Sequence, residues 1–153
     1  MKILIGLIFA TSLFSQTFTK VYAGGISANP NAGIKIAGTG LFAQQVKDSN
    51  TYAFAVVDAL PTTIQPFIVT TQFSGGIAQK ILTINNIPIF IPTSAGVSYN
   101  GTNVGWAWTT GGLASVRVKG NWLVMPNLRL VKSSVSNGTG YQVIAGLLIG
   151  WGQ

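Results

Sequence analysis

Apolar and polar residues alternate along two segments in the last third of the chain. Residues 114–122 place Ala114, Val116, Val118, Gly120 and Trp122 on one face and Ser115, Arg117, Lys119 and Asn121 on the other. A period of two residues is typical of a β-strand, whose successive side chains point to opposite faces. Residues 141–151 keep this period but are apolar on nearly both faces. They predict a strand that is central in a sandwich or exposed to lipid.

Shorter strand signals occur earlier in the chain. Stretches rich in β-branched and aromatic residues lie at 52–57, 67–73, 81–84 and 87–91. Asn85-Asn86 and Asn100-Gly101 stand between such stretches and predict hairpin turns. Pro88 predicts an edge strand, because proline has no N–H to donate to a neighbour. A weak helical pattern is confined to residues 41–48, where it predicts one or two turns.

These patterns predict an all-β protein, a single antiparallel β-sandwich or jelly-roll-like domain of about eight short strands. The alternative is a small eight-stranded β-barrel. Two observations favour the sandwich. Most candidate strands look shorter than the roughly 9–11 residues that a membrane-spanning strand needs. In addition, four prolines, Pro61, Pro66, Pro88 and Pro92, interrupt the middle of the chain.

The first residues have the pattern of a secretory signal peptide. Lys2 precedes an apolar run from Ile3 to Phe14, and Val21-Tyr22-Ala23 places small residues before a cleavage site. We expect a signal peptide at 1–23, cleaved after Ala23, and therefore an exported protein. Residues 24–40 are rich in glycine and are expected to form a flexible arm, in which Ile34 and Ile36 would donate a strand to a neighbouring subunit. The β domain would then span residues 41–153.

Composition excludes most catalytic chemistry. The 153 residues include nine Lys and Arg, two Asp and Glu, no His and no Cys. Catalytic triads, Cys-His pairs and zinc sites of Cys and His therefore cannot form within one chain. A paired-carboxylate site would need both Asp48 and Asp58. We expect no enzymatic activity, no catalytic residue, no bound metal and no cofactor.

One glycine motif would suggest a dinucleotide. Gly38-Thr-Gly40-Leu-Phe-Ala43 matches G-x-G-x-x-A, and Asp58 follows at the spacing of a ribose-binding acid. However, the segment after Gly40 is poor in helix formers, and the strand signals that follow lack the crossover helices of a parallel sheet. Glycine-rich turns of a β protein are the preferred interpretation.

Aromatic and basic residues are the remaining candidates for binding. Trp106 and Trp108 alternate with small residues, so both indoles should project from one face of a strand. The candidates for interface packing or ligand stacking are Tyr99, Trp106, Trp108, Trp122 and Trp151. The candidates for contacts with an anionic partner, lipid or glycan, are Arg117, Lys119, Arg129 and Lys132. These are too few and too scattered for a nucleic-acid surface.

Scarce charge suggests that the surface is covered. Only 7% of the residues are charged, against roughly 25% in ordinary domains. We expect an exported structural subunit of the cell surface or envelope (a fibre, coat or secretion-complex component), packed against copies of itself or other envelope proteins. The alternatives are a small outer-membrane β-barrel and a lectin-like glycan-binding module.

Overall fold

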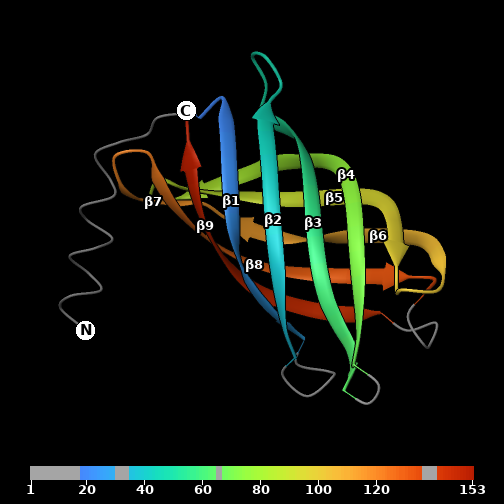
Figure 1. Cartoon of the computed structure of the whole chain (residues 1–153). Coiled ribbons are helices and arrows are strands. Elements are labelled where there is room, and N and C mark those ends of the chain that lie inside the picture. Colours follow the sequence, from blue (N-terminus) through green and yellow to red (C-terminus); the bar gives the residue numbers. More distant parts are fainter. Residues whose placement is uncertain (1–17, 30–34, 65–66, 136–140) are drawn as a thin grey trace.

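The protein is described from a computed structural model that covers residues 18–29, 35–64, 67–135 and 141–153, without the side chains of 29, 35–37, 60–64, 67 and 68. Nine strands form one sheet (Figure 1). They are β1 (Lys20–Asn29), β2 (Lys35–Gln45), β3 (Thr51–Ile64), β4 (Phe67–Ile84), β5 (Ile87–Tyr99), β6 (Val104–Ala114), β7 (Val116–Lys119), β8 (Trp122–Ser133) and β9 (Gln142–Gly152). None of the described residues forms a helix that is long and apolar enough to cross a membrane.

The sheet closes on itself. From β1 to β6 each strand pairs antiparallel with the next, β9 pairs with both β1 and β8, and β8 also pairs with β6. β6 and β7 run along β8 in one register, Leu113 opposite Asn127 and Val116 opposite Val124, so they are one strand interrupted at Ser115. Pro126 lies opposite this interruption and has no N–H to offer it. The result is an eight-stranded antiparallel barrel.

The all-β prediction is confirmed, and the barrel alternative describes the architecture better than the sandwich does. Each of the eight barrel strands has between 10 and 18 residues. The prolines do not shorten them. At Pro92 the β5–β6 ladder is interrupted between Phe90 and Thr93, yet its register is the same on both sides. β5 is not an edge strand, since β4 and β6 flank it and Ser115 N–H donates to the carbonyl oxygen of Pro88.

The turns of the structure confirm two of the predicted hairpins and contradict one predicted strand. Asn85 and Asn86, both at positive φ, form the two-residue turn between β4 and β5, as predicted. The Asn100-Gly101 hairpin is also confirmed, although β6 resumes only at Val104, because Asn100 Oδ1 accepts from the backbone N–H groups of Thr102 and Asn103. Residues 114–122 do not form one strand. Gly120, with a φ of 56°, turns the chain between β7 and β8.

The segment expected to be a flexible arm is built into the barrel. Residues 24–29 belong to β1 and residues 35–40 to β2, and the two strands pair along their whole length. The backbone of Ile36 pairs with Ala28, so its strand is already engaged within the molecule, whereas Ile34 lies outside the described residues. The helical turn expected at 41–48 is also wrong, because residues 41–45 continue β2 and the chain turns after Gln45.

The expected cleavage site falls inside β1. Val21 is buried in the barrel, and Val21, Tyr22 and Ala23 pair with both β2 and β9. Both described ends of the chain meet at one end of the barrel (Figure 1), where the backbone N–H groups of Thr19 and Lys20 donate to the carbonyl oxygen of Gln153. We call this the terminus end, and the opposite end, where β5 ends and β6 begins, the far end.

Candidate functional site

The outer surface of the barrel is apolar. Along β8, Leu123, Met125 and Val131 are buried inside, whereas Leu128, on the alternate face, is 57% exposed. The large outward side chains that are exposed in the middle of the strands are Ile26, Val57, Phe73, Ile77, Ile91, Val97, Leu128, Leu147 and Ile149. Soluble monomers rarely expose so many large apolar side chains together, and extended apolar surfaces usually mark sites of contact with a protein or a membrane.

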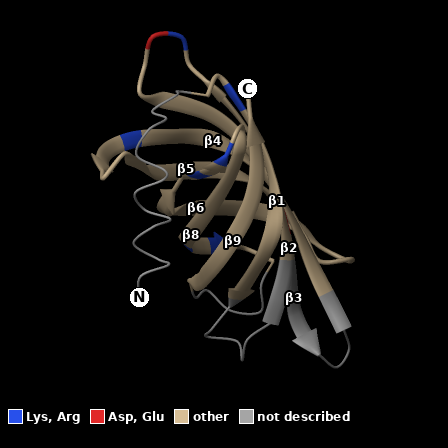
Figure 2. Cartoon of the chain, turned by 90° about the vertical axis from the view of Figure 1, so that its left-hand side faces the viewer, with Lys and Arg blue, Asp and Glu red and all other residues tan. Residues whose placement is uncertain are grey.

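Charges avoid the middle of this surface. Lys20, Lys47, Asp48 and Lys119 are exposed near the terminus end, where Figure 2 shows acidic and basic positions side by side in one projecting turn. Lys132 lies on β8 toward the far end. Among the described outward-facing side chains between these levels there is no Lys, Arg, Asp or Glu. The charge distribution thus leaves an uncharged belt around the barrel.

Aromatic side chains form a row at the terminus end of this belt. The strand registers place Phe42 beside Tyr22, Tyr22 beside Trp151, and Trp151 beside Trp122, across β2, β1, β9 and β8. All four are exposed, and the rings of Tyr22 and Phe42 lie 5.1 Å apart. Sequence reasoning selected Trp122 and Trp151 but missed Tyr22, assigned to the leader, and Phe42, assigned to a helical turn.

A second aromatic group marks the far end. Trp106 is exposed and Ala107 is buried, so Trp106 and Trp108 share the outer face of β6, as the sequence predicts. Tyr99 and Tyr141 are exposed at the same end, and Lys132 Nζ lies 5.1 Å from the Tyr141 ring and 5.9 Å from that of Trp106. Stacking of Trp106 and Trp108 on glycans stays a prediction.

The two aromatic levels are ten residues apart along the chain at β9. Tyr141 directly precedes β9, Trp151 lies near the end of this strand, and both side chains are exposed. Ten steps of about 3.3 Å, on a strand tilted by about 40°, span about 25 Å along the barrel axis. Transmembrane barrels carry an apolar band of about this height between two aromatic girdles.

The lumen holds a polar cluster toward the far end. Asp58 is fully buried and accepts two hydrogen bonds from Arg129, at 2.8 Å from Nη1 and 2.9 Å from Nη2. Thr39 Oγ1 donates to the same carboxylate at 2.7 Å, and Arg129 Nε donates to Asn127 Oδ1 at 3.1 Å. Gln72–Thr109 and Ser74–Ser94 are further side-chain pairs in the lumen. The polar side chains thus largely satisfy one another.

This cluster corrects one sequence-based interpretation and bears on a second. Arg129 is not a contact for an anionic partner, because its guanidinium is buried and its charge is neutralised by Asp58. Asp58 pairs with Arg129, and the glycines of the motif before it, Gly38 and Gly40, lie within strand β2 rather than in the turns that the sequence analysis preferred. The other basic candidates are dispersed. Arg117 lies 4.2 Å over the ring of Phe18 at the terminus end, Lys119 is exposed beside a turn, and Lys132 faces outward.

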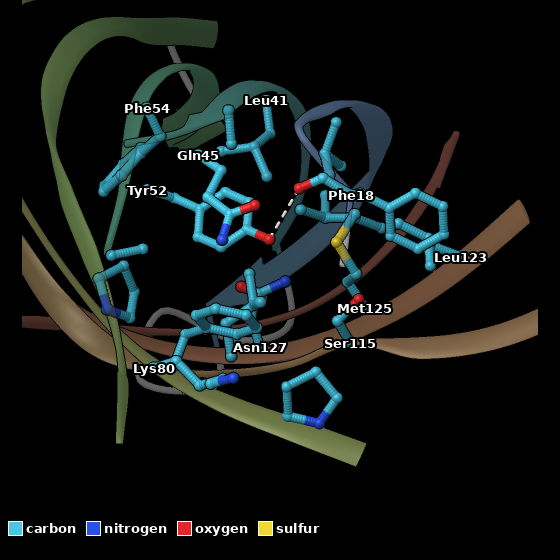
Figure 3. A pocket seen from close by; sticks show the side chains of 18 of the residues that line it. Phe18, Leu41, Gln45, Tyr52, Phe54, Lys80, Ser115, Leu123, Met125 and Asn127 are labelled. Carbon is cyan, nitrogen blue, oxygen red and sulfur yellow. Dashed lines mark hydrogen bonds between the residues drawn. The ribbon is translucent and has the colours of Figure 1, made fainter. Parts of the chain in front are cut away.

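The half of the lumen nearer the terminus end contains a cavity of about 170 Å³ (Figure 3). Its walls are mostly apolar, with Leu41 and Phe54 from β2 and β3 and Leu123 and Met125 from β8. Tyr52 Oη donates to the backbone carbonyl of Phe18, which holds the start of the described chain across this space. Nothing in the sequence pattern indicated this cavity.

Comparisons with known proteins agree with the fold. Neither a protein-family model nor a curated protein sequence matches the chain. Among solved structures, the chain is similar to one described as "De novo design of transmembrane beta-barrels", with a TM-score of 0.52 and 13% sequence identity. The match covers 90% of this chain and 99% of that chain. At this identity the likeness shows the fold, a closed antiparallel β-barrel.

Proposed function

We propose that this chain is an integral β-barrel protein of an outer membrane, without enzymatic activity. One observation carries the proposal: between the two aromatic levels the outward-facing side chains are mostly apolar, whereas half of the lumen is polar and contains a buried ion pair. This is the reverse of a water-soluble protein. A transmembrane barrel satisfies every backbone hydrogen bond within the closed sheet, which a chain in lipid requires.

The two aromatic levels favour lipid rather than protein as the molecule that covers the outer surface of the barrel. Trp and Tyr accumulate at both interfaces of a bilayer, because one part of each ring is apolar and another can reach water. Packing between copies would not require aromatic side chains at two levels about 25 Å apart. The self-assembling envelope subunit stays a prediction, since the same apolar surface would serve it.

The proposal is tested by folding the full chain into phospholipid vesicles. We expect the chain to resist carbonate extraction and to migrate differently on unheated and heated gels. Leu147 faces outward at the centre of β9, where its backbone pairs with Ile26 and Pro126. The substitution Leu147→Arg places a charge at this position. It should lower the free energy of unfolding in the bilayer by about 2–4 kcal/mol.

Gln44→Arg is the matched control, since Gln44 is exposed near the terminus end of β2, beyond the row formed by Phe42 and Tyr22. Its cost should be about 0–1 kcal/mol. Equal costs for the two substitutions would count against a membrane-spanning barrel. A defined oligomer in light scattering without lipid or detergent would favour the self-assembling subunit instead.

A further inference from the structure

The cavity in the lumen has the size and lining of a small-molecule site. At about 170 Å³ it is close to the roughly 150 Å³ of an engineered apolar cavity that binds benzene. This volume is smaller than the roughly 300–1,000 Å³ of sites that bind drug-sized ligands. A lipid acyl chain is therefore too large, and a molecule of about six to eight non-hydrogen atoms fits.

The walls and the rim of the cavity differ in character. Leu41, Phe54, Leu123, Met125 and Leu148 supply an apolar middle layer. Toward the terminus end the lining includes the exposed residues Asn50, Thr83 and Asn86, so the cavity reaches the solvent there. A ligand would enter at this rim and leave its apolar body in the middle layer.

The floor of the cavity carries an unsatisfied donor. Asn127 lines the cavity and is 8% exposed, and its Nδ2 has no hydrogen-bond partner among the described residues. Its Oδ1 already accepts from Arg129 Nε, which fixes the orientation of the amide and directs the donor elsewhere. Leaving a buried donor unsatisfied costs about 1–3 kcal/mol, so an acceptor at this point would be favoured.

The charges at the floor determine the charge of the ligand's acceptor group. Arg129 also lines the cavity, but Asp58 neutralises it through two hydrogen bonds. The other two basic residues that line the cavity, Lys80 and Arg117, lie near the terminus end, beside Asn50 and Phe18. An anionic group at the floor would therefore find no uncompensated cation there among the described residues and would lose its hydration. A neutral acceptor, by contrast, would satisfy Asn127 at little cost.

We propose that the lumen binds a small neutral molecule, mainly apolar, whose single hydrogen-bond acceptor, such as an ether or ketone oxygen, accepts from Asn127 Nδ2. This site is independent of whether the outer surface contacts lipid or other copies of the chain. Its ligand class follows from the volume, the apolar walls and the unsatisfied donor at the floor.

The test uses the chain's two methionines, Met1 and Met125, as reporters. The refolded full chain, labelled with ¹³C at the methionine methyl groups, gives one signal from the cavity and one control signal from Met1. The probes are tetrahydropyran and cyclohexane, which have nearly the same shape and differ in the acceptor oxygen. We expect a saturable shift of the Met125 signal, with about fivefold tighter binding of tetrahydropyran.

Two substitutions locate the binding. Ala43 is buried and lines the cavity, so Ala43→Leu should fill it and remove the saturable shift. Ala55→Leu adds the same side chain to the outer face of the neighbouring strand and should leave binding unchanged. If the Ala43→Leu variant does not fold, the affinities of tetrahydropyran and cyclohexane for the unmodified chain test the proposal by themselves.

Three outcomes would overturn the proposal. A shift that grows linearly and equally for Met1 and Met125 would mean that the probes partition into detergent. The absence of any shift would mean that the cavity holds only solvent. Equal affinities for the two probes would mean that Asn127 does not select an acceptor.

Discussion

At the scale of single residues, the lumen shows how a narrow barrel accommodates a charge pair. Asp58 and Arg129 are 71 residues apart and both buried, and their charges are compensated by each other and by hydroxyl and amide groups. Removing one partner of a buried pair costs about 3–5 kcal/mol, because the remaining charge is left without compensation.

Arg129→Leu tests this dependence. It should lower the free energy of unfolding by about 3–5 kcal/mol, because the Asp58 carboxylate loses both hydrogen bonds from the guanidinium. The double substitution Asp58→Asn with Arg129→Leu should recover part of the loss, since no uncompensated charge remains. Urea unfolding in vesicles measures both values. A double variant as unstable as the single one would show that the loss comes from packing.

Glycines on the inner face allow the strands to approach closely. A Cβ on Gly76 would overlap the carbonyl oxygen of Thr93 and lie 2.6 Å from Ser94 Cα, whereas a Cβ on the neighbouring Gly75 meets only Phe54 O, at 3.7 Å. Similar overlaps with the backbone of a paired strand occur at Gly25, Gly96 and Gly111. Glycine at such inner positions lets a strand bend into a small closed sheet.

At the scale of elements, β1 depends on residues that the sequence assigns to a leader. Val21 is part of the buried cluster with Leu123 and Met125, and Gln153 N–H donates to the carbonyl oxygen of Lys20. Cleavage after Ala23 stays a prediction, and it would remove the first four residues of β1. The remaining strand would begin at Gly24.

Two deletions measure what this segment contributes. Deleting residues 1–17 keeps β1 intact, whereas deleting residues 1–23 removes the buried Val21 and the hydrogen bonds of Thr19 and Lys20. Burying a Val side chain contributes about 1.5–3 kcal/mol, and each hydrogen bond about 1 kcal/mol. We expect the longer deletion to unfold at a clearly lower urea concentration. Equal midpoints would show that the barrel is complete from Gly24 onward.

At the scale of the whole molecule, the polar cluster that closes the far half of the lumen predicts that the barrel does not conduct ions. Barrels of eight strands have an interior that side chains just fill, whereas barrels of 16–18 strands enclose an aqueous channel. Here the cluster around Asp58 and Arg129 occupies the far half. In a planar bilayer we expect no stepwise current, with a 16-stranded porin as the positive control. Steady current steps from the unmodified chain would contradict a lumen that is closed in its far half.

Features of the fold that depend only on neighbouring residues were predictable from the sequence. The turn at Asn85-Asn86 and the two faces of residues 141–151 were predictable, because a tight turn and a period of two depend on neighbouring residues. The strong alternation at 114–122 was misleading, because it continues through the Gly120 turn that separates β7 from β8. Periodicity alone does not reveal such a turn.

By itself, the sequence determined that the chain is all-β, that it is poor in charge and that it lacks common catalytic residues. Only the tertiary structure decided which face of each strand is inside, because alternation defines two faces without saying which one meets solvent, lipid or lumen. Closure through β6–β8 and β1–β9 brings Asp58 to Arg129 and aligns Phe42, Tyr22, Trp151 and Trp122 in one row. These contacts are long-range and depend on the registers of the paired strands, which no local pattern encodes.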